Sequence, residues 1–131
     1  MSQTTKRRFL LALVSVTIVG ALAFVVAAAS KPAPREIVMV AREVAFFLPG
    51  DPTPNPTLVV APGESVRLRL VNEDRGVEHD WAAGSLGVAT RLLAGDGSAD
   101  VVVFTAPHER GSHRYVCSSH AAMMSGRLEV R

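Results

Sequence analysis

A short stretch near the C-terminus carries four side chains that bind soft metal ions. The eight residues from 117 to 124 include a thiol, an imidazole and two thioethers, those of Cys117, His120, Met123 and Met124. Sulfur ligands together with imidazole suit copper, and electron-transfer copper sites combine two histidines and one cysteine with a distant axial methionine. The stretch therefore predicts one side of a copper site, which needs a second histidine from elsewhere in the chain.

Cys117 is the single cysteine of the chain. It cannot form a disulfide within the chain, so it is free, intermolecular or a metal ligand. A catalytic cysteine–histidine pair is disfavoured, because Cys117 and His120 are only three residues apart and no third residue is placed to orient the histidine. Zinc is disfavoured as the metal, because zinc sites prefer four strong nitrogen or sulfur ligands and have no use for a thioether.

Three further histidines could complete the site: His79, His108 and His113. His79 is the best candidate, because the segment 77–81 begins a strand just after a turn and can point to the same end of a sheet as the Cys117 loop. His113 shares a strand and a face with Cys117, but four residues at about 3.3 Å each separate them by roughly 13 Å. His113 is therefore interpreted as a core or rim histidine, and His108, in a turn, as an exposed loop histidine.

The elements that must position these residues have the periodicity of β-strands. Alternating segments rich in β-branched residues predict strands at 37–47, 57–60, 65–71, 78–82, 99–105, 113–118 and 126–131. About seven short strands separated by turn residues, with no amphipathic helix between them, indicate an all-β antiparallel sandwich or small barrel. The segment 84–94 is compatible with a strand, a loop or a single helical turn.

The first 30 residues have the features of an export segment. The basic cluster Lys6-Arg7-Arg8 precedes 21 uncharged residues and the small residues Ala27-Ala28-Ala29-Ser30. A helix of that length spans roughly 31 Å, which is enough to cross a bilayer. Residues 1–30 are predicted to be a signal peptide or, favoured by the length, an uncleaved membrane anchor. Because the basic cluster stays inside, the rest of the chain is expected in the periplasm or on the outer face of the cytoplasmic membrane. Residues 31–35 are interpreted as a linker and 36–131 as the domain.

The positive net charge belongs to the leader. The chain has 14 basic and 12 acidic residues, a net charge of +2. Residues 1–29 hold three of the basic residues and none of the acidic ones, which leaves 11 basic against 12 acidic residues and a net charge of −1. A nucleic-acid-binding domain needs surplus basic charge, so nucleic acid is excluded as a partner. Four charged residues are interpreted as a solvent-facing surface: Arg67, Arg69, Asp74 and Arg75.

The order of the motifs resembles that of the single-domain blue (type 1) copper proteins, the cupredoxin family of plastocyanin, azurin and amicyanin. The resemblance covers most of residues 36–131 and rests on five pieces: Ala61–Val66, Asn72 with His79-Asp80, Phe104–Pro107, Gly111–Tyr115 and Cys117–Gly126. It implies a Greek-key β-sandwich that binds one copper ion, Cu(I) or Cu(II), through His79, Cys117, His120 and Met124.

The sequence departs from the family pattern at two positions, the axial methionine and the residue after the first histidine. In the family the axial methionine is followed by one residue and then glycine, which selects Met124; Met123 is the alternative and is otherwise an apolar gap-filler. The residue after the first histidine is often asparagine, whereas here it is Asp80. A carboxylate accepts hydrogen bonds and does not donate them, so the environment of the site is expected to differ at this position.

The resemblance implies an electron carrier and not an enzyme. It predicts a one-electron shuttle whose redox partner proteins dock transiently where the edge of His120 faces solvent within a small apolar surface of Ala121, Ala122 and Met123. Two other functions stay open, namely a copper-binding or copper-delivery module without electron transfer and a cupredoxin-fold accessory domain of a membrane complex. Trp81 and Tyr115 are interpreted as core or rim aromatic residues without a redox role.

Overall fold

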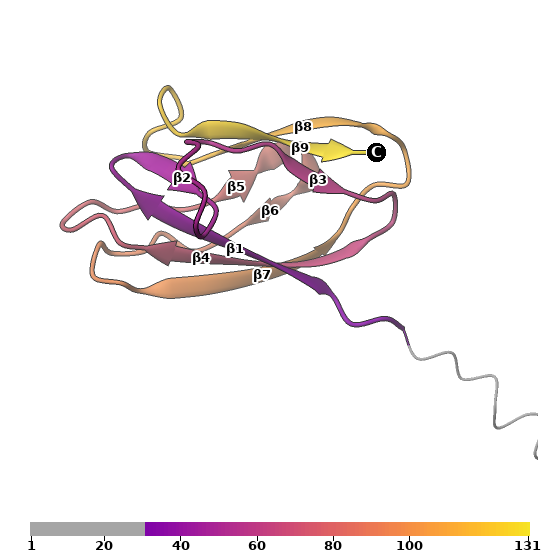
Figure 1. The fold of residues 1–131 in the computed structure, drawn as a ribbon, viewed down its shortest axis with the longest axis horizontal. Coiled ribbons are helices and arrows are strands. Elements are labelled where there is room, and N and C mark those ends of the chain that lie inside the picture. Colours follow the sequence, from indigo (N-terminus) through magenta and orange to yellow (C-terminus); the bar gives the residue numbers. More distant parts are fainter. Residues whose placement is uncertain (1–30) are drawn as a thin grey trace, which may run out of the picture. The chain divides into compact units, whose positions relative to one another are not determined.

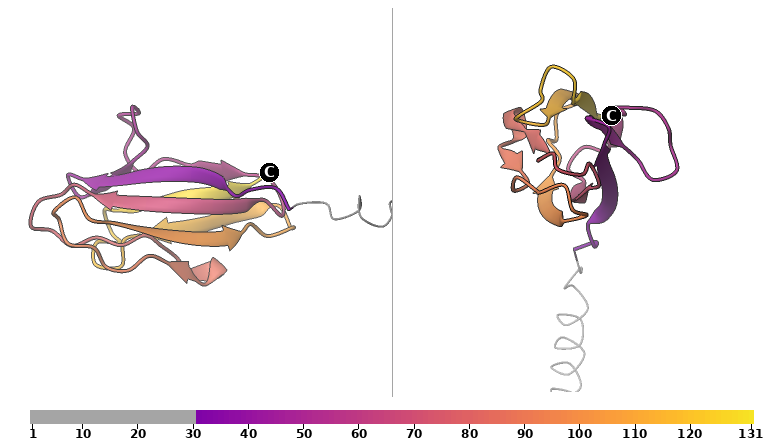
Figure 2. Two further views of the ribbon diagram at one scale, coloured as in Figure 1. Left: turned by 90° about the horizontal axis from the view of Figure 1, so that it is seen from below. Right: turned by 90° about the vertical axis from the view of Figure 1, so that its left-hand side faces the viewer.

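The computed structural model describes residues 31–131, in which nine strands form two sheets packed face to face (Figures 1 and 2). This arrangement confirms the predicted all-β sandwich. The predicted leader and its helix, residues 1–30, lie outside the described residues. Between residues 31 and 131, no helix is long and apolar enough to cross a membrane.

The first sheet has the strand order β2-β1-β4-β7. Its strands are β1 (Arg35–Arg42), β2 (Ala45–Phe47), β4 (Ser65–Asn72) and β7 (Ala99–Thr105). Along β4 the side chains alternate, with Val66, Leu68 and Leu70 buried and Arg67 and Arg69 exposed. Because successive side chains of a strand point to opposite faces, this alternation directs the apolar face of β4 into the sandwich. The solvent-facing positions of the two arginines are as predicted.

The second sheet has the strand order β3-β9-β8-β5-β6. Its strands are β3 (Leu58–Val60), β5 (Ala82–Ala83), β6 (Val88–Ala89), β8 (Gly111–Val116) and β9 (Ser125–Val130). A single 3-10 turn, Gly84–Leu86, joins β5 to β6. The segment 84–94, for which the sequence left three structures open, thus contains one helical turn and one very short strand.

The expectation of an antiparallel sandwich holds only in part, because both sheets are mixed. β1 pairs with β4 in parallel, and β3 pairs with β9 in parallel. Parallel neighbours need a crossover connection. Here the chain leaves the first sheet after β2, contributes β3 to the second sheet and returns as β4. Alternation of side chains along a strand carries no signal of such a crossing between sheets.

Two of the predicted strands are broken or cut short in the structure, and the others, except 99–105, shift by one or two residues at one or both ends. The segment 37–47 is a hairpin, because Glu43 and Val44 take left-handed conformations, with φ of 51° and 53°, between β1 and β2. The segment 78–82 forms only an isolated bridge from His79 to Leu93 before β5 begins at Ala82. Left-handed backbone is unusual for a β-branched residue, so nothing in the sequence at Val44 indicates a turn.

Aromatic side chains pack between the sheets beside the predicted site. The ring of Trp81 stacks on Tyr115 and on Phe104, with centroid distances of 5.6 and 6.1 Å. The Tyr115 hydroxyl donates a hydrogen bond to the carbonyl of Pro56. Trp81 and Tyr115 are both fully buried, which confirms that they belong to the core. Each lies two residues from a candidate ligand, so the packed rings support the segments that carry the site.

The connections gather at the two ends of the sandwich (Figure 1). One end, here called the β8–β9 end, holds the β1–β2, β4–β5, β6–β7 and β8–β9 connections. The other, the β7–β8 end, holds the β3–β4 and β7–β8 connections and the C-terminus. His79 and Cys117 therefore reach the same end from different segments.

Candidate metal centre

The loop between β8 and β9 carries Cys117 and His120 on a tight turn. The His120 amide donates to the Cys117 carbonyl at 3.2 Å, and the Met124 amide donates to the His120 carbonyl at 2.8 Å. The Cys117 amide donates in turn to the Met124 carbonyl at 3.0 Å. The loop is thus closed by its own backbone, which places the thiol and the imidazole on one side of the turn.

His79 comes from the β4–β5 connection and is held by its backbone. Its amide donates to the Leu93 carbonyl at 3.0 Å, and the Leu93 amide donates to the His79 carbonyl at 2.8 Å. The buried side-chain amide of Asn72 donates to the carbonyls of Val77 and Leu93, each at 2.8 Å. Asn72 therefore binds both the segment that contains His79 and the segment of Leu93 that pairs with it.

The donor atoms of three predicted site residues converge. The Sγ atom of Cys117 lies 3.6 Å from Nδ1 of His79 and 3.5 Å from Nδ1 of His120, and the three atoms lie within 4.8 Å of one another. Three donors that surround one ion in a plane at about 2.0–2.3 Å lie about 3.5–4.0 Å apart, and both sulfur–nitrogen distances match this range. His79 and Cys117 are fully buried and His120 is partly exposed.

The two methionines of the loop have different surroundings. Met124 is fully buried in the same hydrophobic cluster as Cys117, whereas 61% of Met123 is exposed. The interpretation of Met123 as a gap-filler is wrong, since an exposed side chain fills no gap in the core. The burial of Met124, together with the backbone hydrogen bond that it accepts from the Cys117 amide, favours it as the thioether of the site.

The fold is shared with solved structures of copper proteins. Auracyanin from Roseiflexus castenholzii matches with a TM-score of 0.59 at 18% identity over 76% of this chain and 99% of that chain. Auracyanin A, a "blue" copper protein from Chloroflexus aurantiacus, matches with 0.58 at 23% identity over 76% and 100%. A multicopper oxidase from Aquifex aeolicus matches with 0.61 at 14% identity over 76% of this chain and 27% of its own. No protein-family model and no curated protein sequence matches the chain.

The chain adopts the cupredoxin fold. The chemistry of its donor group fits the metal of that fold, because two imidazoles, one thiol and one buried thioether suit copper. A zinc site would leave the thioether without a use. The cupredoxin domain thus has the donors for one copper ion, as predicted.

Asp74 belongs to the site of the cupredoxin domain, and its interpretation as a solvent-facing charge is wrong. Its Oδ2 atom lies 3.0 Å from Nε2 of His79 and accepts the Val44 amide at 2.9 Å. The hydrogen bond from His79 holds the pKa of the Asp74 carboxyl below its ordinary value of 3.8. An ionised carboxylate only accepts hydrogen bonds, so this contact requires a proton on Nε2 of His79, and in the neutral ring that tautomer leaves a lone pair on Nδ1, the atom 3.6 Å from the Cys117 sulfur.

Asp80 joins the two segments that form the centre. Its Oδ1 atom accepts the Ser118 amide and its Oδ2 atom accepts the Ser118 hydroxyl, both at 2.6 Å. The carboxylate therefore clamps the residue next to Cys117 to the residue next to His79. The predicted acceptor role of Asp80 is seen here as a link between loops that lie 38 residues apart.

Burial governs the chemistry of the thiol in the metal-free chain. It raises the pKa of Cys117, against the opposing effect of backbone hydrogen bonds from Asp80, Ser119 and His120. A nucleophilic cysteine needs the reverse, a lowered pKa and access to solvent. The environment therefore disfavours cysteine catalysis, and a metal ion bound here would have to displace the thiol proton.

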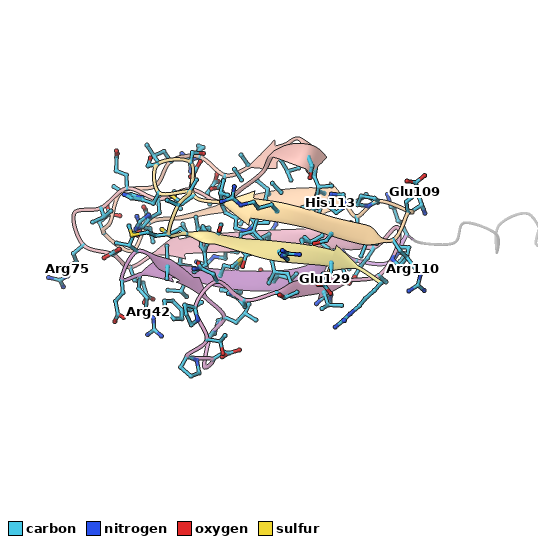
Figure 3. All side chains as sticks on the ribbon, turned by 90° about the horizontal axis from the view of Figure 1, so that it is seen from above. Arg42, Arg75, Glu109, Arg110, His113 and Glu129 are labelled. Carbon is cyan, nitrogen blue, oxygen red and sulfur yellow. The ribbon has the colours of Figure 1, made fainter. Side chains whose placement is uncertain are left out.

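The two remaining histidines lie outside the donor group, as the sequence predicts. His108 is exposed in the β7–β8 connection, beside Gly63. His113 lies on β8, where its Nδ1 atom is 3.0 Å from the Ser85 hydroxyl (Figure 3). Figure 3 also places Glu109 and Arg110 at the opposite end of the sandwich from Arg75.

Proposed function

We propose that the chain carries single electrons between redox partner proteins, with copper bound by His79, Cys117, His120 and Met124. The observation that carries the proposal is the convergence of two imidazole nitrogens and the Cys117 sulfur at one end of the sandwich, with the Met124 side chain buried in the same cluster. Copper held there supplies a one-electron couple, Cu(II)/Cu(I). A reduced partner gives up one electron, an oxidised partner later accepts it, and no atoms are transferred.

The hydrogen bonds that hold the donor residues in place suit electron transfer. Electron transfer is favoured when one arrangement of ligands is acceptable to both oxidation states, which requires ligands that move little. Asn72 holds the segment of His79, and Asp80 ties that segment to the Cys117 loop. The partly exposed ring of His120 gives a short route from the buried sulfur to the surface.

We propose an extracytoplasmic location and transient partners. Residues 1–30 have the composition of an export signal or anchor, and an uncleaved anchor would attach the domain to the membrane. Partner proteins would dock over the edge of His120, beside Ala121 and Ala122, through the small interfaces typical of electron-transfer encounters. The mass of the native protein tests whether the leader is removed.

We propose no enzymatic activity. The buried thiol of Cys117 is a poor nucleophile. The multicopper oxidase that shares the fold is matched over only 27% of its own chain, so the likeness covers a small part of that enzyme.

Absorption spectroscopy of the copper-loaded protein tests the proposal. Cu(II) bound to a cysteine thiolate in a trigonal site gives an intense visible band. We expect this band in the wild-type protein, its loss or displacement in His79→Ala, and an unchanged band in the control His108→Ala. A colourless Cu(II)-loaded protein, or a band that depends on His108 and not on His79, would overturn the ligand assignment.

Copper delivery is the second candidate, and the exposed thioether of Met123 favours it. Met123 lies three residues after the partly exposed His120, and its amide donates to the His120 carbonyl at 2.9 Å. A soft donor on the surface could receive Cu(I) from the site. Voltammetry separates the two candidates: a reversible one-electron wave supports the carrier. Fast loss of Cu(I) to a chelator, slowed in Met123→Leu, supports delivery.

A further inference from the structure

An ionised carboxylate stands behind the ring of His79. The Oδ2 atom of Asp74 lies 3.0 Å from Nε2, on the side of the ring away from Nδ1 and the Cys117 sulfur. His79 is fully buried and the Asp74 side chain is 19% exposed. The hydrogen bond is therefore shielded from most of the solvent that weakens surface pairs.

The carboxylate is placed independently of the histidine. Its Oδ2 atom also accepts the amide of Val44 at 2.9 Å, from the turn between β1 and β2. The Asp74 amide donates to Oδ1 of Asn72 at 3.0 Å, and the Asp74 carbonyl accepts the Val77 amide at 3.0 Å. The turn between β1 and β2 and the neighbouring residues Asn72 and Val77 thus hold the acceptor in position before any metal binds.

We propose that Asp74 is a positioning residue of the metal centre, which holds the His79 ring and lowers the reduction potential of bound copper. The inference rests on the proposed function. A hydrogen bond to a charged acceptor is roughly twice as strong as a neutral one, and such a partner makes a ligating histidine more basic. A more basic ligand stabilises the oxidised, more highly charged ion, so the reduced form is disfavoured.

Two substitutions at Asp74 separate charge from geometry. Asp74→Asn keeps an oxygen that accepts both hydrogen bonds and removes the negative charge, whereas Asp74→Ala removes the acceptor as well. We expect Asp74→Asn to keep the visible band and to shift the oxidised-to-reduced equilibrium about tenfold toward the reduced form, which for one electron is a rise of about 59 mV. We expect Asp74→Ala to bind copper about 10–100-fold more weakly.

A measurement without metal tests the positioning role separately. Nitrogen NMR shifts of the His79 ring report which nitrogen carries the proton. We expect the proton on Nε2 in the metal-free wild-type protein and in Asp74→Asn, and a mixture of the two tautomers in Asp74→Ala. A protein that binds no copper would refute the proposed function and leave this measurement to decide the role of Asp74.

Glu64→Gln is the matched control. The Glu64 side chain is 21% exposed, accepts a backbone amide from Ala61 and pairs with Arg35 at the β7–β8 end, so its substitution removes the same charge from a similar environment. We expect its reduction potential to equal that of the wild type. The proposal is overturned if Asp74→Asn shifts the potential no more than Glu64→Gln, or if Asp74→Ala leaves the His79 tautomer unchanged.

Discussion

The two ends of the sandwich are supported in different ways. At the β8–β9 end, side chains reach from one connection to another. Asp80 accepts two hydrogen bonds from Ser118, Asp74 accepts the amide of Val44, and the Asn55 side chain donates to the Met123 carbonyl at 2.9 Å. Partners in these pairs lie 30 to 68 residues apart in the chain. Each bond therefore fastens one loop to another.

At the β7–β8 end the turns are joined mainly by backbone. The Gly63 amide donates to the Pro107 carbonyl at 3.2 Å, and the Ala106 amide donates to the Glu64 carbonyl at 2.8 Å. The side chains add an ion pair of Arg35 with Glu64, of which Arg35 is about half exposed. Within residues 31–131, buried or half-buried polar side chains thus fasten distant loops to one another at the end where the donor atoms must be held, and their loss should cost more there.

The largest difference between the ends is expected from substitutions of glycine. A Cβ atom at Gly95, near the metal centre, would lie 1.8 Å from the backbone carbonyl oxygen of Asp74, so the backbone of Asp74 must move. We expect Gly95→Ala to lower the free energy of unfolding of the metal-free protein by about 3 kcal/mol and to disturb the visible band of the copper form.

Gly63→Ala is the counterpart at the other end. Its Cβ atom would lie 2.6 Å from the ring of His108, an exposed side chain that can turn away. The backbone there is left-handed, with φ of 71°, which costs about 1 kcal/mol for alanine. Denaturant unfolding of both variants measures the contrast, and equal losses would mean that the two ends are equally tolerant.

A smaller effect is expected from the clamp at Asp80. Asp80→Ala removes two charge-assisted hydrogen bonds and leaves the Ser118 amide unpaired, which should cost about 2 kcal/mol in the metal-free protein. Asp80→Asn should cost less, because the amide oxygen can accept from the Ser118 backbone and the NH₂ group can donate to the hydroxyl. Thermal unfolding gives the cost, and hydrogen exchange of residues 117–124 should quicken in Asp80→Ala. A loop with unchanged exchange would show that Asp80 does not hold it.

The smallest effect is expected from the ion pair at the β7–β8 end. The hydrogen bond from Arg35 lowers the pKa of Glu64 from its ordinary value of 4.5. Because the pKa is lower in the folded state, the pair stabilises the protein above that value, and the contribution is lost as pH falls through the folded pKa. We expect less than about 1 kcal/mol, weakened by salt.

Unfolding of the wild type and of Glu64→Gln between about pH 3 and about pH 6 measures this contribution. The difference between the two proteins should shrink at the acidic limit and in high salt. A difference that grows as the pH falls would contradict the assignment.

The donor group and the fold class follow from the sequence because they depend on local properties. Cys117, His120 and the neighbouring methionines are a few residues apart, and their side-chain chemistry indicates copper in any fold. Alternation with a period of two predicts strands, and from the strands and turns the choice of His79 over His108 and His113 follows. The all-β sandwich and the convergence of the three donors agree with these predictions.

The supports of the site depend on contacts between distant segments, and the role of Asp74 left no local trace in the sequence. Asp74 stands between Glu73 and Arg75, both exposed, so the charge pattern predicts a solvated loop. It reaches His79 and Val44 because the β4–β5 connection folds against the turn between β1 and β2. The turn at Val44 and the parallel strand pairs also depend on contacts between distant segments. The chemistry of a side chain determines which hydrogen bonds it can form. Its partner is determined by how the loops pack when the two sheets assemble.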